Sequence, residues 1–187
     1  MRVVAGTARG VTLKTPEGMS TRPTTDRVKE SLFNIIQFDV PCAAVLDLFG
    51  GTGQLGIEAL SRGAKSATFV DIQESACKLI RENLKRTKFS EQGRVVCSDY
   101  DAFLRNCKEK FDLIFLDPPY AEVFLENALN FITEIDILQS GGIITTERPF
   151  GKPLTASFPG FERSRDYKYG NTVLTLFRKV GTGSQEV

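Results

Sequence analysis

The stretch LDLFGGTGQLG, residues 46–56, passes from an apolar run through a glycine-rich loop into a helical pattern. Its last six residues fit the pattern G-x-G-x-x-G, whose glycines permit positive φ angles and a close approach of the backbone to a ligand. Asp71 lies 20 residues after Gly51 and ends the next apolar run, where a carboxylate can bind two ribose hydroxyls. This order of strand, loop, helix, strand and acid predicts a site for an adenosine-containing ligand in a parallel α/β sheet.

The chain around this stretch repeats the alternation of apolar runs and helical patterns. We expect strands at residues 44–49, 66–72, 94–98, 111–117 and 141–147, and helices at 54–63, 74–88, 101–106 and 124–135. Two antiparallel strands, 161–169 and 172–179, are expected to follow, separated by a Gly-Asn turn. Near-continuous apolar strands are typical of a sheet covered on both faces. The pattern predicts a doubly wound, Rossmann-like α/β sheet, mostly parallel with an antiparallel C-terminal strand.

The first 40 residues precede this alternation. Residues 2–5 and 10–14 predict a β-hairpin, and Thr24 or Thr25 can cap a helix whose apolar residues recur at helical spacing. The length suits a single domain. We expect that domain to span residues 1–180, with an N-terminal hairpin and helix extension (1–40), a cofactor-binding catalytic core (41–180) and a disordered polar tail (181–187).

Composition limits the class of protein. The 187 residues are 41% hydrophobic and 25% charged, which is typical of a soluble globular domain. No apolar run approaches the roughly 18 residues of a membrane helix, and the N-terminus lacks the apolar core of a secretory signal. We therefore expect a cytoplasmic protein without a membrane partner. The sequence does not indicate an oligomeric state, and a monomer is the default expectation.

Histidine is absent and cysteine is rare. Without histidine, the common general base, the Ser-His and Cys-His nucleophile pairs and the usual metal ligand are all missing. The spacings of the four cysteines fit neither a zinc site nor a disulfide framework, so we expect buried, reduced thiols and no metal; they are Cys42, Cys77, Cys97 and Cys107. Any chemistry must come from positioning, carboxylates and the backbone.

Positive charge gathers at the two ends of the chain, although the net charge is only +1. Residues 1–30 carry six basic side chains against three acidic ones, and residues 148–187 carry seven against three. If both ends face the same side, they form a modest basic surface suited to phosphates. The alternative is an ordinary solvated face.

The acids near the glycine loop indicate which ligand it binds. Asp47 lies in the first core strand, just before the glycine loop, where a carboxylate can orient the loop and hold a cationic amino group, but would be unhelpful beside a pyrophosphate. That favours S-adenosylmethionine over a nicotinamide dinucleotide. Asp99 follows the third strand, where it can accept a hydrogen bond from the adenine amino group. Asp101 is the better candidate to cap the next helix, which leaves Asp99 free for the ligand.

The fourth core strand ends in Asp117-Pro118-Pro119-Tyr120. Two consecutive prolines remove two backbone donors, so the Asp117 carboxylate and the Pro118 carbonyl remain as acceptors, and Tyr120 offers a flat face. These groups suit a planar group that bears an NH2. Its nitrogen lone pair can be turned toward an electrophilic methyl group, and no prior deprotonation is needed. The alternative is a proline-rich turn that only ends a strand.

The order of these motifs resembles the class I S-adenosylmethionine-dependent methyltransferases that act on exocyclic amino groups. The N-terminal patterns R-x-x-A-G-x-x-R-G (residues 2–10) and RPTTDRVKESLFNI (22–35) are similar to the RsmD family, over about residues 1–180. The resemblance implies S-adenosyl-L-methionine as cofactor. It also implies methylation of the 2-amino group of a guanine in small-subunit (16S) ribosomal RNA, so that ribosomal RNA or the small subunit is the partner.

The resemblance also assigns roles to individual residues. It implies cofactor contacts at Asp47, Gly51, Gly53, Asp71 and Asp99, and a target-base site at Asp117, Pro118, Pro119 and Tyr120. It places the segment with Arg22, Thr24, Thr25, Asp26 and Arg27 near the mouth of the active site, where these residues either contact ligands or start a helix. Charge and resemblance together suggest an RNA clamp at Arg2, Arg9 and Lys14.

Other functions share some of these features. A DNA adenine-N6 methyltransferase also uses Asp-Pro-Pro-Tyr, but such enzymes usually carry a large recognition insertion for which this chain has no room. A protein-glutamine methyltransferase typically has asparagine at the position of Asp117. A nicotinamide-dependent oxidoreductase or a non-catalytic RNA-binding module leaves Asp-Pro-Pro-Tyr unexplained.

Overall fold

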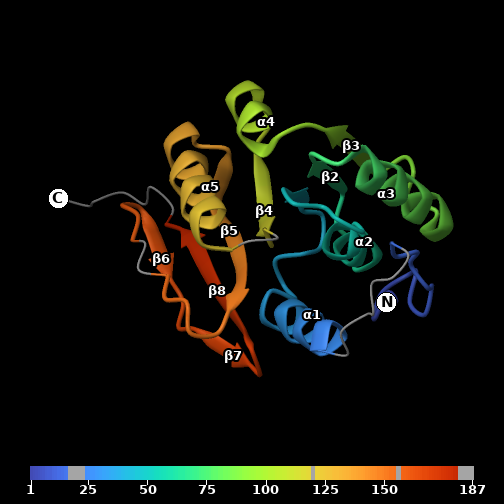
Figure 1. Ribbon diagram of the computed structural model, residues 1–187, viewed down its shortest axis with the longest axis horizontal. Helices are drawn as coiled ribbons and strands as arrows, with labels where there is room; N and C mark the ends of the chain where they lie inside the picture. Colours follow the sequence, from blue (N-terminus) through green and yellow to red (C-terminus); the bar gives the residue numbers. More distant parts are fainter. Residues whose placement is uncertain (17–23, 119–120, 155–156, 181–187) are drawn as a thin grey trace.

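Helices and strands alternate along the chain in the computed structural model, which describes residues 1–16, 24–118, 121–154 and 157–180, without the side chains of 24–25 and 121–123 (Figure 1). The strands are β1 (Ala44–Asp47), β2 (Ser66–Asp71), β3 (Gly93–Cys97), β4 (Phe111–Leu116), β5 (Leu138–Pro149), β6 (Phe161–Arg163), β7 (Tyr167–Tyr169) and β8 (Thr172–Lys179). The helices are α1 (Thr24–Ile35), α2 (Gln54–Ser61), α3 (Glu74–Thr87), α4 (Tyr100–Asn106) and α5 (Ala121–Ile135).

The described strands form one sheet in the order β3-β2-β1-β4-β5-β8-β6, with β7 also paired to β8. The first five strands in this order are parallel, and β8 runs antiparallel to β5, β6 and β7. The predicted doubly wound sheet with an antiparallel C-terminal strand is therefore confirmed. Because β1 lies between β2 and β4, the chain changes direction across the sheet there, and ligands bind outside the carboxyl ends of the strands at such a switch point.

Each face of the sheet packs against its own apolar core. Val45, Leu113 and Phe115 point to the face covered by α1, α2 and α3. Leu46 and Ile114 point to the opposite face, which α4 and α5 cover. Alternation along each strand thus supplies both cores, which explains why the central strands read as near-continuous apolar runs.

The predicted strand over 161–169 is interrupted, because side chains replace part of its backbone ladder. The backbone N–H of Leu176 donates to the hydroxyl of Ser164 (3.0 Å), and the hydroxyl of Thr175 donates to the carboxylate of Asp166 (2.7 Å). The chain therefore pairs with β8 twice, as β6 and as β7.

Residues 1–16, which we call the N-terminal arm, pair as the predicted hairpin only through one isolated bridge, between Arg2 and Thr12. Val3 N–H donates to the carbonyl of Val11 (3.0 Å), which extends the pairing slightly. Gly6 has φ +81°, and a Cβ there would lie 1.7 Å from the carbonyl oxygen of Ser61. Only glycine therefore lets the arm approach α2 this closely.

The expectation of buried cysteines is correct only for Cys77. Cys42 and Cys97 are exposed, and Cys107 is half-buried. No helix in the described part of the chain is long and apolar enough to cross a membrane. The expected tail 181–187 lies outside the described residues, and the division of the domain at residue 40 stays a prediction.

Candidate active site

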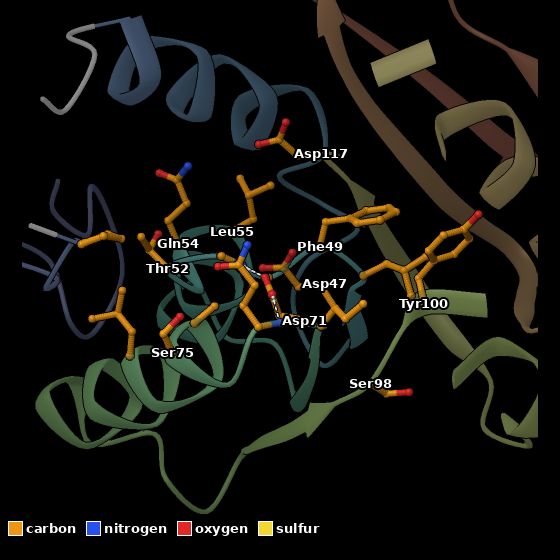
Figure 2. Close-up of a pocket in the computed structure, with 18 of the residues that line it drawn as sticks. Asp47, Phe49, Thr52, Gln54, Leu55, Asp71, Ser75, Ser98, Tyr100 and Asp117 are labelled. Carbon is orange, nitrogen blue, oxygen red and sulfur yellow. Dashed lines mark hydrogen bonds between the residues drawn. The ribbon is translucent and has the colours of Figure 1, made fainter. Parts of the chain in front are cut away.

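A cavity of about 730 Å³ opens at the carboxyl ends of β1, β2, β3 and β4 (Figure 2). Five residues of the predicted cofactor and target-base sites line the cavity: Asp47, Gly51, Asp71, Asp99 and Asp117. Two others, Gly53 in the glycine loop and Pro118 after β4, are buried and do not line it. Segments far apart in the sequence thus bring four carboxylates to one space.

The glycine loop has the backbone geometry that the sequence predicted. Gly51 and Gly53 have φ angles of +53° and +77°. The Gly53 N–H donates to the carbonyl of Gly50 at 2.6 Å, which closes a tight turn before α2. A Cβ on Gly53 would lie 3.2–3.3 Å from Ile80 and Ile57, so even a methyl group is crowded there.

Asp47 lies at the end of β1 and is only 3% exposed. Its Oδ2 accepts a hydrogen bond from the backbone N–H of Gly56 (3.1 Å), in the first turn of α2. Burial raises the pKa of Asp47 to about 7, and the negative charges of Asp117 and Asp71 add to the effect. A carboxylate in these surroundings gains from a cationic partner.

Asp71, at the end of β2, links the glycine loop to the start of α3 through its two carboxylate oxygens. Oδ2 accepts from Gly51 N–H (2.9 Å), and Oδ1 accepts from Gln73 N–H (2.8 Å) (Figure 2). A carboxylate has about four acceptor positions, so each oxygen keeps capacity for a ligand hydroxyl. Asp71 is half-buried at the cavity surface.

The prediction that Asp101 caps α4 is wrong. Asp99 is the N-cap, with extended backbone angles (φ −61°, ψ 143°), and its Oδ1 accepts from Asp101 N–H at 2.9 Å. Asp101 instead lies in the first helical turn and pairs with Arg105. Asp99 still lines the cavity, but one of its oxygens is used by the helix.

Asp117 follows β4 and enters the cavity from the side of α1, apart from Asp47 and Asp71 (Figure 2). Burial raises the pKa of Asp117 to about 6. Pro118 is buried behind it. Pro119 and Tyr120 lie outside the described residues, so their predicted part in a target-base site stays a prediction.

Gln54, the first residue of α2, adds an acceptor for which the sequence suggested no role. Its Oε1 is buried and has no hydrogen-bond partner among the described residues, and its side chain lines the cavity. A buried amide oxygen without a partner costs free energy that a ligand N–H would recover. Together with Asp47, it gives this part of the cavity the character of a site for an amino group.

Three aromatic rings on the cavity wall were also missed by the sequence reasoning. The ring of Tyr100 lies 5.4 Å from that of Phe49 and 6.0 Å from that of Phe124, between centroids. Burial, and next the charges of Asp99 and Asp101, raise the pKa of Tyr100, so its hydroxyl stays protonated. The positions gave a signal, because Phe49 lies just beyond β1, Tyr100 starts α4 and Phe124 lies in the first turn of α5, all at this edge of the sheet.

The N-terminal arm forms another part of the wall through Met1 and Pro16. Glu58 of α2 is fully buried and accepts from the backbone N–H groups of Val4 (2.8 Å) and Ala5 (2.9 Å). Its carboxylate also pairs with the buried Lys29 of α1 (3.2 Å), whose Nζ donates to the carbonyl of Arg2. The arm is therefore fixed to α1 and α2 by buried polar groups.

Four predicted RNA-binding residues are exposed: Arg2, Arg9, Lys14 and Arg27. Lys14 donates to Glu82 of α3 at 2.6 Å, so its charge is partly compensated. Arg22 lies outside the described residues. Asp26 is half-buried, and one of its carboxylate oxygens has no hydrogen-bond partner in the described part of the chain.

The C-terminal cations are less available than their number suggests. Arg148 is buried and pairs with Asp166, while Arg178 pairs with Asp39. Lys179 pairs with Asp136. The two basic ends lie at opposite ends of the sheet, with α1 between them in Figure 1. The two groups of cations are therefore not neighbours, and a common basic face stays a prediction.

The doubly wound sheet, with a glycine loop after β1 and acids after β2 and β4, defines the fold of the class I methyltransferases. A solved structure from Escherichia coli has a TM-score of 0.88 with 31% sequence identity, and the match covers 97% of this chain and 99% of that one. The chain belongs to the family described as conserved hypothetical protein 95, the RsmD family, whose model matches residues 1–178.

Named relatives agree with this assignment. "Ribosomal RNA small subunit methyltransferase D" of Escherichia coli strain K12 is 31% identical over 186 residues, which are 100% of this chain and 93% of the relative. The protein of the same name from Haemophilus influenzae is 37% identical over 157 residues, or 82% of this chain and 81% of the relative. The predicted family is confirmed.

Proposed function

We propose that this protein is an S-adenosylmethionine-dependent methyltransferase that methylates the 2-amino group of a guanine in small-subunit (16S) ribosomal RNA. The observation that carries the proposal is a single cavity in which carboxylates lie at two separate places. Asp47 and Asp71 lie beside the glycine loop, and Asp117 enters from the end of β4. The names of the relatives support ribosomal RNA of the small subunit as the substrate.

The residues of the cavity fit the cofactor. Asp71 suits the two ribose hydroxyls, and Asp47 with the unpartnered amide oxygen of Gln54 suits the cationic amino group. Asp99 and the Phe49 and Tyr100 rings remain for an adenine. S-adenosylmethionine, when bound, supplies an electrophilic methyl group on a positively charged sulfur.

Asp117 is the group that acts on the substrate amine. With a pKa of about 6 it is mainly ionised at neutral pH, so it accepts a hydrogen bond from the NH2. We propose the backbone carbonyl of Pro118 as the second hydrogen-bond acceptor for the NH2 group. Held by both hydrogens, the nitrogen keeps its lone pair free to form the new bond to carbon, and it releases one proton to Asp117 or to water. Holding the reactants in position contributes about 7–11 kcal/mol to such reactions.

The target base must reach this half-buried acid in the cavity. An unpaired guanine does so directly, whereas a paired one must be extruded at a cost of a few kcal/mol. We propose that stacking on Tyr120 returns about 1–3 kcal/mol of that cost. We also propose that the protein works in the cytoplasm as a monomer, since ribosomal RNA is its substrate and one chain supplies every group named above.

Titration calorimetry with S-adenosylmethionine and with NAD tests the cofactor, and we expect heat only from the former. Labelled cofactor is then incubated with small ribosomal subunits, free ribosomal RNA and DNA, and the label is mapped. We expect one guanine of the small-subunit RNA to be labelled, at a rate that falls as the pH drops below about 6, because protonated Asp117 no longer carries the negative charge that stabilises the developing ammonium.

Asp117→Ala should lower the transfer rate by about 10²–10³-fold, the usual effect of removing one group that stabilises developing charge, while cofactor affinity is retained. Asp101→Asn is the matched control, because Asp101 pairs with Arg105 outside the cavity. Label on DNA or protein would refute the substrate. Loss of cofactor binding in Asp117→Ala would refute the role given to Asp117.

A further inference from the structure

Phe150 is a large aromatic side chain left in solvent directly after β5. It is 57% exposed, and the ammonium nitrogen of Lys168, on β7, lies 3.3 Å from the centre of its ring. Single exposed apolar residues are common and need no explanation. An aromatic ring next to a cation, however, is the pair of groups that binds a stacked base and its phosphate.

The turn that bears Phe150 is held rigidly. Phe150 N–H donates to the carbonyl of Asn171 (2.8 Å), which ties the turn to the start of β8. Below it, Nε of Arg148 donates to the carbonyl of Lys152 (2.9 Å), across the turn. Arg148 is only 5% exposed, so a buried guanidinium supports a turn on the surface. An exposed ring fixed in this way loses little conformational entropy when a ligand binds.

The same guanidinium also positions Lys168. Its Nη1 donates to the hydroxyl of Thr175 (3.0 Å), and its Nη2 donates to the carboxylate of Asp166 (2.5 Å), two residues before Lys168. In the sheet register, both Arg148 and Lys168 lie opposite Val173, so their side chains share a face. One buried network therefore places the ring and the cation together.

Phe150 and Lys168 lie at the same end of the sheet as the candidate active site, where the parallel strands have their carboxyl ends. Leu116 is aligned with Thr146 in the β4–β5 pairing, so Asp117 lies opposite Glu147 and Phe150 lies three residues further along the same edge. Three residues of extended chain span roughly 10 Å. A few nucleotides of a single strand cover that length, since stacked bases repeat about every 3.4 Å.

We propose that Phe150 and Lys168 form a docking platform for the single-stranded RNA next to the target nucleotide. An unpaired base stacks on the open side of the Phe150 ring, and a neighbouring phosphate lies near Lys168. Charge supports RNA as the occupant, because Arg165 and Lys168 are both exposed and no ion pair in the described part of the chain involves either of them. The platform deepens the proposed function and rests on it.

Phe150→Ala tests the platform in the full-length protein. We expect its affinity for small-subunit ribosomal RNA, measured by fluorescence anisotropy without cofactor, to fall about 5- to 150-fold, the equivalent of one lost stacking contact. KM for small ribosomal subunits should rise in parallel, with kcat and S-adenosylmethionine affinity unchanged. Phe150→Tyr should behave like the parent, because it keeps the ring.

Phe38→Ala is the matched control, since Phe38 is 89% exposed but lies in the loop between α1 and β1, at the amino end of the sheet. It should stay within twofold of the parent. The platform is refuted if Phe150→Ala also stays within twofold, if Phe38→Ala shows the same loss, or if Phe150→Ala changes the sedimentation of the free protein, which would make the patch a contact between copies.

The two proposals can fail separately. A parent protein that binds RNA through Phe150 but transfers no methyl group refutes the proposed function and leaves the platform standing. Full methyl transfer with an unchanged KM in Phe150→Ala refutes the platform alone.

Discussion

Asp47 is buried near two further carboxylates, Asp71 and Asp117, and accepts one hydrogen bond from the backbone N–H of Gly56. Burial is the largest influence on its titration, and it raises the pKa of Asp47 to about 7. The ionised form is therefore unfavourable in the protein without ligand. A cation bound next to Asp47 would remove this penalty, which makes the residue a source of cofactor affinity rather than of stability.

Asp47→Asn should accordingly stabilise the protein above pH 7 and weaken cofactor binding. In the folded state Asp47 titrates near pH 7, and in the unfolded chain near its ordinary value of 3.8. Between these values the folded state binds more protons, so the free energy of unfolding falls as the pH rises from about 4 to 7. The variant has no carboxyl group to titrate, so its free energy of unfolding does not fall in this way. At pH 8 it should exceed that of the parent by at least about 1 kcal/mol, since one pKa unit equals about 1.4 kcal/mol.

Urea unfolding of parent and variant at pH 5, 6, 7 and 8 measures this effect, and calorimetry measures cofactor affinity, which should fall about tenfold or more with the lost charged contact. A variant less stable than the parent at every pH, with unchanged cofactor affinity, would contradict this role of Asp47.

Helix α3 connects the N-terminal arm to the glycine loop through one side chain. Asn83 is fully buried; its Oδ1 accepts from the backbone N–H of Lys14 (2.7 Å), and its Nδ2 donates to the carbonyls of Lys14 (3.0 Å) and Thr52 (2.9 Å). The arm that carries the candidate RNA-binding cations and the loop that faces the cofactor are thus held by the same amide.

Asn83→Ala should loosen both segments at once. It leaves backbone groups of Lys14 and Thr52 without partners and should cost about 1–3 kcal/mol in the free energy of unfolding. Hydrogen exchange should speed up in residues 1–16 and in the glycine loop, and cofactor affinity should fall. Glu82→Ala, which removes the exposed pair with Lys14 on the neighbouring position, should change neither. Faster exchange confined to the arm would show that the loop does not depend on Asn83.

The elements themselves could be predicted from the sequence, whereas several contacts between them could not. Apolar periodicity defines α3 and β4 within a residue or two, because burial on one or two faces imposes it directly. The cap of α4 was mispredicted because Asp99 and Asp101 are both good caps, and backbone angles decide between them. The sequence alone suggests that Arg148 is an ordinary surface cation. Its partners Asp166 and Thr175 reach it only when β5, β7 and β8 pair in the folded sheet. The burial of the Gln54 amide oxygen and the partners of Asn83 likewise depend on the folded chain.

At the scale of the whole molecule, the cavity lies between two different basic regions. The N-terminal arm lines it on the side of α2 and α3. Towards the other end of the sheet lie β7 and the end of β5 (Figure 1); Lys168 lies on β7, and Phe150 directly follows β5. A strand of RNA that reached Asp117 would therefore meet exposed cations on both sides of the site, Arg9 on one side and Lys168 on the other.

Arg9→Ala tests this arrangement through the salt dependence of RNA binding. Arg9 is exposed in the turn of the arm, and no ion pair involves it in the described part of the chain. Each phosphate contact on single-stranded nucleic acid contributes about 0.7 to the slope of log affinity against log salt concentration. Arg9→Ala should lower that slope by about this amount between 50 and 200 mM salt, the interval over which such contacts are usually resolved.

Arg178→Gln is the matched control; it removes an equal charge that already pairs with Asp39 and should leave the slope unchanged. Equal slopes for Arg9→Ala and the parent would exclude the arm as an RNA clamp, because a lost phosphate contact cannot leave the number of released counterions unaltered.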